Sequence, residues 1–156
     1  MVATVKLQAT NDPESWYDVT YLRFKTADNN TDDQNNPCVI PPSGTNYSYE
    51  KEVRVNVSVA PSVRLDNLTM ELEAALDTGL SMYYGWSATY FTPNAGLNLA
   101  TNGPLTTTPV DWNNAADNFT GTGVWGDNCA LQIRIVNTAS PGAMTEQDFI
   151  ITYDEI

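Results

Sequence analysis

The 156-residue sequence contains no histidine, which excludes the Ser-His and Cys-His nucleophile pairs of many hydrolases. It also lacks the GxSxG, P-loop and GxGxxG motifs. Two carboxylate pairs, Glu71 with Glu73 and Asp111 with Asp117, are the remaining candidates for glycoside cleavage. Acids on the polar face of a strand are usually only solvated, so we expect no catalytic residue and no enzymatic activity.

Basic residues are scarce. Seven Lys and Arg stand against nineteen Asp and Glu, giving a formal net charge of −12 and a pI near 4.1. Such a charge repels phosphate backbones, so we expect no nucleic-acid partner. Apolar runs are only a few residues long, far short of the roughly 20 that a spanning helix needs, so we expect no membrane association. The first residues form no apolar signal segment, which favours synthesis in the cytoplasm without a signal peptide.

Cysteine is nearly absent as well. Cys38 and Cys129 are too far apart for a CxxC motif, and no histidine is present to complete a zinc site. Two interpretations stay open, a pair of buried thiols or a disulfide between them. A chain of this length can bury about 70% of its unfolded surface, so it needs neither metal nor disulfide to fold.

The sequence has a dominant hydrophobic period of two, which is typical of half-buried strands. Val53, Val55, Val57 and Val59 alternate with polar residues. Four further segments have strand character: 2–10, 16–26, 131–135 and 149–153. The pattern predicts a single all-β domain over residues 1–156, an antiparallel β-sandwich of jelly-roll or immunoglobulin-like type. The predicted core includes Val55, Val57, Leu131, Ile133 and Ile151.

Residues 68–76 are ambiguous, because their leucines fit either a helix or a strand. We favour a strand, a hairpin turn at Asp77-Thr78-Gly79, and a second strand over 81–91. Two long segments, 27–49 and 92–123, are rich in turn-forming residues and are predicted to be loops. Loops this long are commonly functional or wrap a neighbouring molecule.

The first loop contains the only candidate metal ligands. Asp28, Asp32 and Asp33 lie among several asparagines, and oxygen-rich loops suit Ca²⁺. The loop lacks the glycine and the terminal glutamate of an EF-hand, and a solvated polar loop is the alternative. No other cofactor is expected.

Aromatic residues gather at 83–91 and near the predicted loop ends. They favour a sandwich core or a subunit interface, with a sugar-binding platform as the alternative. Four of them are our candidates for a protein interface: Tyr47, Tyr49, Trp112 and Trp125.

Two segments resemble sequences of small structural proteins of tailed double-stranded DNA viruses. They are 41–49 (PPSGTNYSY), which leads into a strand, and the terminal 149–156 (FIITYDEI). The acidic, histidine-free, Asn/Thr-rich character of the chain is similar to that group too.

This resemblance implies a virion component, most specifically a bacteriophage capsid decoration or cement protein. Such proteins bind the outside of an icosahedral shell, often as trimers, and clamp neighbouring capsomers. The implied partners are a major capsid protein or another virion protein and further copies of this chain, and the implied location is the virion. The alternative is a carbohydrate- or receptor-binding module of a tail, fibre or surface; a surface-layer or pilus-like subunit is a third possibility.

Overall fold

A computed structural model describes residues 2–31, 34–142 and 144–156. Over these residues the protein is all-β, with eleven strands and no helix, as the sequence predicts. The described residues therefore contain no helix of the length and apolarity that a membrane crossing requires. The strands are β1 (Thr4–Thr10), β2 (Tyr17–Asp18), β3 (Thr45–Tyr47), β4 (Lys51–Val59), β5 (Leu65–Leu72), β6 (Leu80–Ser87), β7 (Asn102–Leu105), β8 (Val110–Asp111), β9 (Gly123–Val124), β10 (Asn128–Val136) and β11 (Phe149–Glu155).

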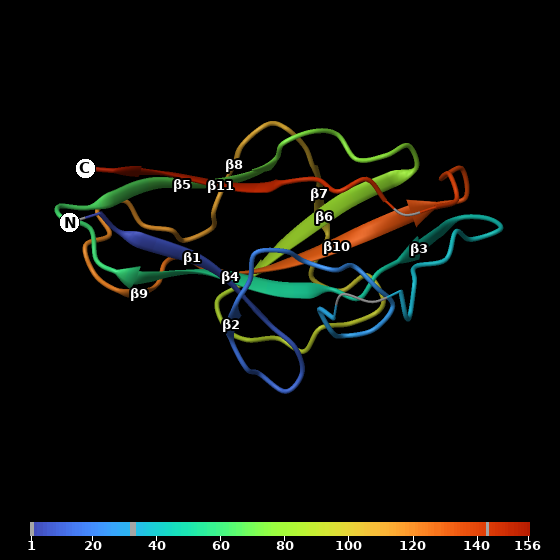
Figure 1. Cartoon of the computed structure of the whole chain (residues 1–156), viewed down its shortest axis with the longest axis horizontal. Helices are drawn as coiled ribbons and strands as arrows, with labels where there is room; N and C mark the ends of the chain where they lie inside the picture. The colour runs from blue at the N-terminus through green and yellow to red at the C-terminus, as the bar shows by residue number, and fades with distance from the viewer. Residues whose placement is uncertain (1, 32–33, 143) are drawn as a thin grey trace.

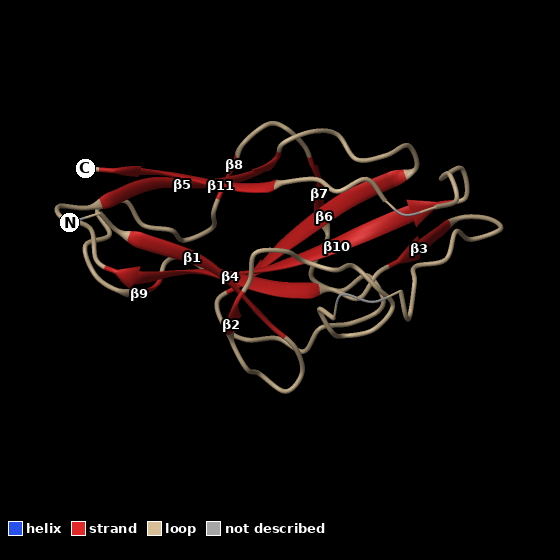
Figure 2. Ribbon diagram, in the orientation of Figure 1, coloured by secondary structure: helices blue, strands red, loops and turns tan. Residues whose placement is uncertain are grey.

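The strands form two antiparallel sheets that are unequal in size (Figures 1 and 2). We call them sheet A and sheet B. Sheet A has eight strands, with the order β2-β1-β4-β10-β6-β7, and β3 and β9 added on β10 and β4. Sheet B has three strands, in the order β11-β5-β8. This two-layer arrangement is consistent with the predicted β-sandwich.

The core lies between the sheets, where the period-two pattern places it. Val55, Val57, Leu131 and Ile133 are all buried, which confirms four of the five predicted core positions. Ile151 differs, because it is only half-buried and packs against the edge of the core. Its strand, β11, is at the edge of sheet B, where no neighbouring strand covers it.

The first part of the ambiguous segment 68–76 is a strand, as predicted, since residues 68–72 belong to β5; residues 73–76 are irregular. The hairpin that we expected after it is wrong, because β5 pairs with β11 and β8 whereas β6 pairs with β10 and β7. The turn at Asp77-Thr78-Gly79 therefore carries the chain from sheet B to sheet A. Hydrophobic periodicity does not distinguish these two connections, since both have a turn between apolar strands.

Two other predicted segments are wrong in part. Of residues 16–26, only Tyr17–Asp18 is a strand; the rest is irregular, although Leu22 and Phe24 pack on the core. Segment 92–123 is not one loop, since β7 and β8 lie within it and each pairs with a longer strand. These strands were missed because they have only two to four residues, too few to show a period. The described part of segment 27–49 is largely irregular, apart from β3.

The outer face of sheet A is covered by the irregular segment that follows β6, residues 88–101. Glu50, which is fully buried, accepts hydrogen bonds at one carboxylate oxygen from the backbone N–H groups of Leu99 (2.6 Å) and Ala100 (3.0 Å). Gln132, also fully buried, donates to the carbonyl of Gly96 at 2.9 Å. Both faces of sheet A are therefore occupied here, and this region has little exposed sheet surface.

Candidate binding site

The edge of sheet B at β11 is the longest free strand edge in the described structure. β11 has seven residues and pairs only with β5, whereas the other outermost strands, β2, β7 and β8, have two to four residues. Long edges are unusual, because unpaired N–H and C=O groups invite a further strand. β11 is therefore the natural place to look for a protein contact.

The pairing pattern shows which main-chain groups of β11 face outward. The N–H of Glu73 donates to the carbonyl of Asp148 at 2.9 Å, so residue 148 bonds toward β5. Hydrogen-bonded and outward positions alternate along an antiparallel pair. Phe149 and Ile151 therefore direct their N–H and C=O groups away from β5, to the free edge.

The far end of this edge is protected. The register with β5 shifts between Thr152 and Asp154, a β-bulge or irregularity, and two acidic residues, Asp154 and Glu155, follow. Bulges and charges are the usual means by which sheet edges resist further pairing. The part of β11 that is open to a partner strand is consequently the beginning, residues 149–152.

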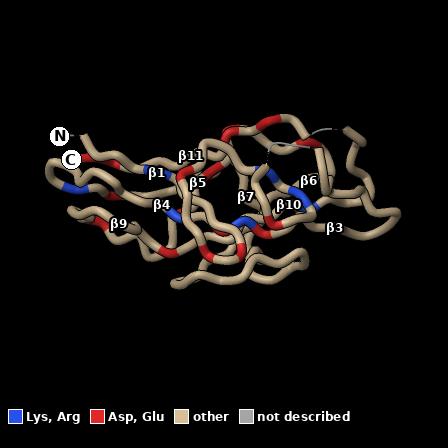
Figure 3. Tube along the Cα trace, turned by 60° about the horizontal axis from the view of Figure 1, so that its bottom comes forward, with Lys and Arg blue, Asp and Glu red and all other residues tan. Residues whose placement is uncertain are grey.

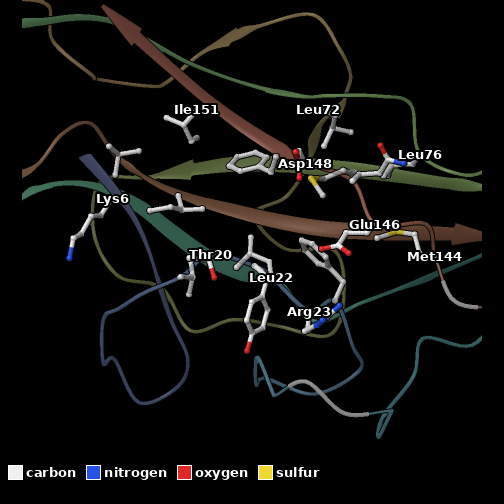
Figure 4. A pocket seen from close by; sticks show the side chains of 18 of the residues that line it. Lys6, Thr20, Leu22, Arg23, Leu72, Leu76, Met144, Glu146, Asp148 and Ile151 are labelled. Atoms are coloured by element: carbon white, nitrogen blue, oxygen red, sulfur yellow. The ribbon is translucent and has the colours of Figure 1, made fainter. Parts of the chain in front are cut away.

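A crevice lies between the sheets on the inner side of this open part. It has a volume of about 380 Å³ and lies between the irregular segment 19–24, β1 and residues 144–151 (Figure 4). Its wall combines apolar and polar surface in nearly equal parts. The apolar side chains that line it include Leu7, Leu22, Leu72, Leu76, Phe149 and Ile151.

Four charged residues also line the crevice, and two of them already have partners. Lys6 forms a salt bridge with Asp18, and its hydrogen bond lowers the pKa of the Asp18 carboxyl below its usual value. The guanidinium of Arg23 lies 5.1 Å from the centre of the Tyr21 ring. The other two, Glu146 and Asp148, are exposed, and their side chains form no hydrogen bond or ion pair with the described residues. The Tyr21 ring leaves the positive charge of Arg23 in place, so Arg23 offsets one of these two carboxylates. With Lys6 neutralised by Asp18, the net charge along the crevice is still negative.

Trp112 and Trp125, two of the four predicted interface residues, are only 2% and 1% exposed. The indole of Trp112 donates to the carbonyl of Asp127 and packs edge-on against Trp86, with ring centres 5.2 Å apart. The indole of Trp125 donates to the carbonyl of Ala116. Both belong to the core of this chain, so assigning them to an interface is wrong. Their polar atoms are satisfied internally, which is how a buried tryptophan is normally accommodated.

Tyr47 and Tyr49, the other two predicted interface residues, are partly exposed. The Arg134 guanidinium lies between two aromatic rings, 3.3 Å from the centre of Tyr83 and 5.6 Å from that of Tyr47. Tyr49 lies just before β4, and its N–H donates to the carbonyl of Lys25. Neither tyrosine lines the crevice. Both remain predicted interface residues, on a part of the surface separate from it.

The calcium prediction rests on one described residue. Asp32 and Asp33 lie outside the described residues. Asp28 accepts a hydrogen bond from the N–H of Asp12 at 2.7 Å. Nearby, the buried ammonium of Lys51 donates to the carbonyl of Asn29, and burial lowers the pKa of Lys51 to about 8. Within the described ranges no three His, Cys, Asp or Glu side chains are grouped as metal ligands.

The two cysteines are both free thiols, which settles the open alternative. Cys129 is fully buried, and Cys38 is partly exposed. Burial raises the pKa of the Cys38 thiol to about 11 and that of Cys129 further still. Neither side chain is a nucleophile at neutral pH.

The carboxylates considered for glycoside cleavage lie on sheet B or next to it. Glu71 is on β5 opposite Ile150, and Asp111 is on β8 opposite Thr69. Asp117 accepts the N–H of Asn67 at 3.0 Å and so holds the chain at the start of β5. Neither the crevice nor the groove described next is lined by any of them.

A second, shallower groove of about 450 Å³ lies beside β2. Its lining includes two tyrosines, Tyr17 and Tyr21, and three asparagines, Asn11, Asn29 and Asn30. Burial raises the pKa of Tyr17, while a hydrogen bond from Asn11 opposes this increase to a smaller extent. An aromatic ring beside amide groups is a combination that can contact a sugar.

Sequence reasoning missed the crevice and its acidic rim, Glu146 and Asp148. The available signal was the terminal alternating strand, which identified β11 but not its position at an edge. Comparison of the chain with models of protein families, with curated protein sequences and with solved structures finds no match in any of the three. The function must therefore be argued from the residues themselves.

Proposed function

We propose that this protein is a virion structural component, a capsid decoration or cement protein that binds an icosahedral shell and stabilises it. The observation that supports this most directly is the open start of β11, with two outward main-chain positions beside a crevice that contains apolar side chains. A free strand edge next to such a crevice favours attachment to another protein through strand addition. The role is non-catalytic, and the virion is its location.

For the topology we propose the more specific jelly-roll or immunoglobulin-like class. Chain crossings between the sheets support it, because β4 and β6 lie in sheet A whereas β5, between them in the sequence, lies in sheet B. Such crossings are typical of Greek-key sandwiches.

The decoration protein is proposed to act as a homo-oligomer, most specifically a trimer, docked on the major capsid protein or another virion protein. Segment 92–123, which we predicted to be a loop able to wrap a neighbouring molecule, contributes part of the core of this chain, because Ala100 and Leu105 within it are buried.

The experiment is electron cryomicroscopy of particles from a culture that produces this chain, together with particles that lack it. We expect density for the sandwich at equivalent sites on the outer shell, and a lower temperature of DNA release from the particles that lack it. Density confined to a tail or fibre, or no density on the particle, would contradict the proposal.

Docking through β11 is tested by Ile151→Pro, which removes an N–H that points to the free edge. Asp111→Pro is the matched control, because the register of β8 directs its N–H away from β5 at the opposite edge of sheet B. We expect Ile151→Pro to lower particle occupancy at least tenfold and Asp111→Pro to leave it unchanged. Thermal unfolding of both variants shows whether each is folded.

The second groove favours a second candidate function, a carbohydrate- or receptor-binding module. Tyr21 is 47% exposed and could stack on a sugar ring. A glycan array probed with the purified chain tests it, with Tyr21→Ala expected to abolish any binding and Val63→Ala, exposed elsewhere, to preserve it. Binding that survives Tyr21→Ala would exclude this groove.

A further inference from the structure

We propose that the crevice and the open start of β11 receive an extended segment of the partner protein. This segment alternates apolar with polar side chains and carries Lys or Arg at the end that lies beside Glu146 and Asp148. The inference rests on the proposed docking function and specifies the chemistry of the partner.

The first step of the argument is the unequal width of the two sheets. Sheet B ends at β11, while sheet A continues under it to β1 and β2 (Figure 1). On the inner face of β1, Val5 and Leu7 are only half-buried, and both line the crevice. A fourth strand of sheet B, added beside β11, would cover this surface.

The second step concerns side-chain direction. Phe149 and Ile151 line the crevice with their side chains and direct their main-chain groups to the free edge. Residues directly opposite each other in paired strands point to the same face of the sheet. Every second residue of an added strand would therefore point into the crevice, where apolar side chains would pack against Leu7, Leu22 and Ile151.

The third step is volume. A cavity of about 150 Å³ already holds a benzene molecule, so the crevice of about 380 Å³ has room for two side chains of valine or leucine size. Alternate positions of one strand lie about 7 Å apart, which permits two such side chains to enter together.

The fourth step is charge. Lys6 is neutralised by Asp18, so the two carboxylates of Glu146 and Asp148 outnumber the one remaining cation of the crevice, Arg23 (Figure 4). Acidic residues also dominate the rest of the chain, whose net charge is −12 (Figure 3). Complementary rim charges accelerate association and select against acidic partners.

A second copy of this chain does not fit that description. The long strand of this chain that starts with lysine and alternates valine with polar residues, β4, is a central strand of sheet A, so it is not available to a second copy. The occupant is therefore a segment of a different protein.

The test uses the full chain and a fluorescent nine-residue peptide that alternates valine with threonine and ends in two lysines. Two control peptides replace the lysines by glutamates or place the valines consecutively. Fluorescence anisotropy should detect binding of the first peptide and at least tenfold weaker binding of both controls. Raising NaCl from 50 to 500 mM should weaken binding of the lysine peptide severalfold.

Variants locate the site. Glu146→Lys should weaken peptide binding at least tenfold, and so should the milder double variant Glu146→Gln with Asp148→Asn. Asp111→Lys makes the same charge change at the opposite edge of sheet B and should leave binding unchanged. Thr20→Trp fills the crevice and should abolish binding, whereas Thr107→Trp, exposed in another loop, should leave it intact.

The outcomes separate this inference from the proposed function. Equal binding of the lysine and glutamate peptides, or binding that survives both Thr20→Trp and the Glu146 variants, overturns the inference. Absence of peptide binding while Ile151→Pro still abolishes particle occupancy also overturns it, but leaves the decoration role in place. Full particle occupancy of a folded Ile151→Pro protein overturns docking through β11 itself.

Discussion

The carbonyl oxygen of Leu99 lies so close to Gly85 that a Cβ built on this glycine would be only 1.7 Å from it. Gly85 is in the middle of β6, and Leu99 belongs to the segment that covers the outer face of sheet A. The absence of a side chain at residue 85 is therefore what allows 88–101 to lie flat on the sheet. This contact gives the first prediction.

Gly85→Ala should destabilise the protein by about 3 kcal/mol or more, because backbone and not a flexible side chain must move. Denaturation by urea measures this loss. Gly121→Ala is the control, since nothing lies within 4 Å of a Cβ at that position. An unchanged urea midpoint for Gly85→Ala would show that the covering segment does not sit on β6.

Glu52→Gln should change the dependence of stability on pH. Glu52 is fully buried, and burial raises the pKa of its carboxyl from 4.5 to about 7, although a hydrogen bond from Asn128 at 2.8 Å opposes the shift. Between these values the unfolded carboxyl ionises while the folded one stays protonated, so stability falls as the pH rises from about 4.5 to about 7.

The glutamine variant lacks this loss. The free energy of unfolding of Glu52→Gln, minus that of the parent protein, should therefore rise by about 3 kcal/mol at most between pH 4.5 and pH 8. Urea titrations at these two pH values measure the difference, with the exposed Glu146→Gln as control. Parallel pH profiles for the parent and Glu52→Gln proteins would contradict the burial of an uncharged Glu52.

Val57→Ala should cost about 2 to 4 kcal/mol, because Val57 is fully buried between the sheets and its truncation leaves a cavity. Val63→Ala is a matched control, since Val63 is 57% exposed. Thermal unfolding compares the two. A midpoint for Val57→Ala equal to that of the control would mean that β4 turns its other face to the core.

The thiols should be nearly inert in the folded protein. With a pKa of about 11, only about one Cys38 side chain in a thousand is a thiolate at pH 8, and Cys129 is fully buried. Ellman's reagent should therefore react slowly with the native protein. In guanidinium, which unfolds the protein, it should react rapidly and count two thiols per chain. A count of zero after unfolding without reductant would reveal a disulfide instead.

Much of this fold is predictable from period two, because apolar residues recur at every second position on the inner face of the long strands. Val57 in β4 and Leu131 in β10 were identified in this way, although consecutive residues at the start of both strands are buried on both faces. The short strands β7 and β8 were not, since their pairing depends on a neighbour rather than on their own pattern. Trp125 was assigned to an interface for a related reason. Its position after a predicted loop does not show whether the side chain is covered by other parts of the same chain.

The crevice was beyond sequence reasoning altogether. Its walls come from segments that are remote along the chain, such as Leu22 and Ile151. Hydrophobic patterns identify which residues are buried. They do not show that sheet A extends beyond the edge of sheet B at β11. The acidic rim at Glu146 and Asp148 therefore becomes meaningful only when the edge beside it is known.

The order of strands in the sheets also determines when the fold can form. β10 joins β4 to β6 at the centre of sheet A, and β11 is the partner of β5 along its whole length. Sheet A cannot close before residues 128–136 have been synthesised, and sheet B cannot close before residues 149–155 have been. Pairings between segments so distant along the chain are slow to form. Until then β4 and β5 have exposed edges, and a net charge of −12 disfavours their association with other copies of the unfinished chain.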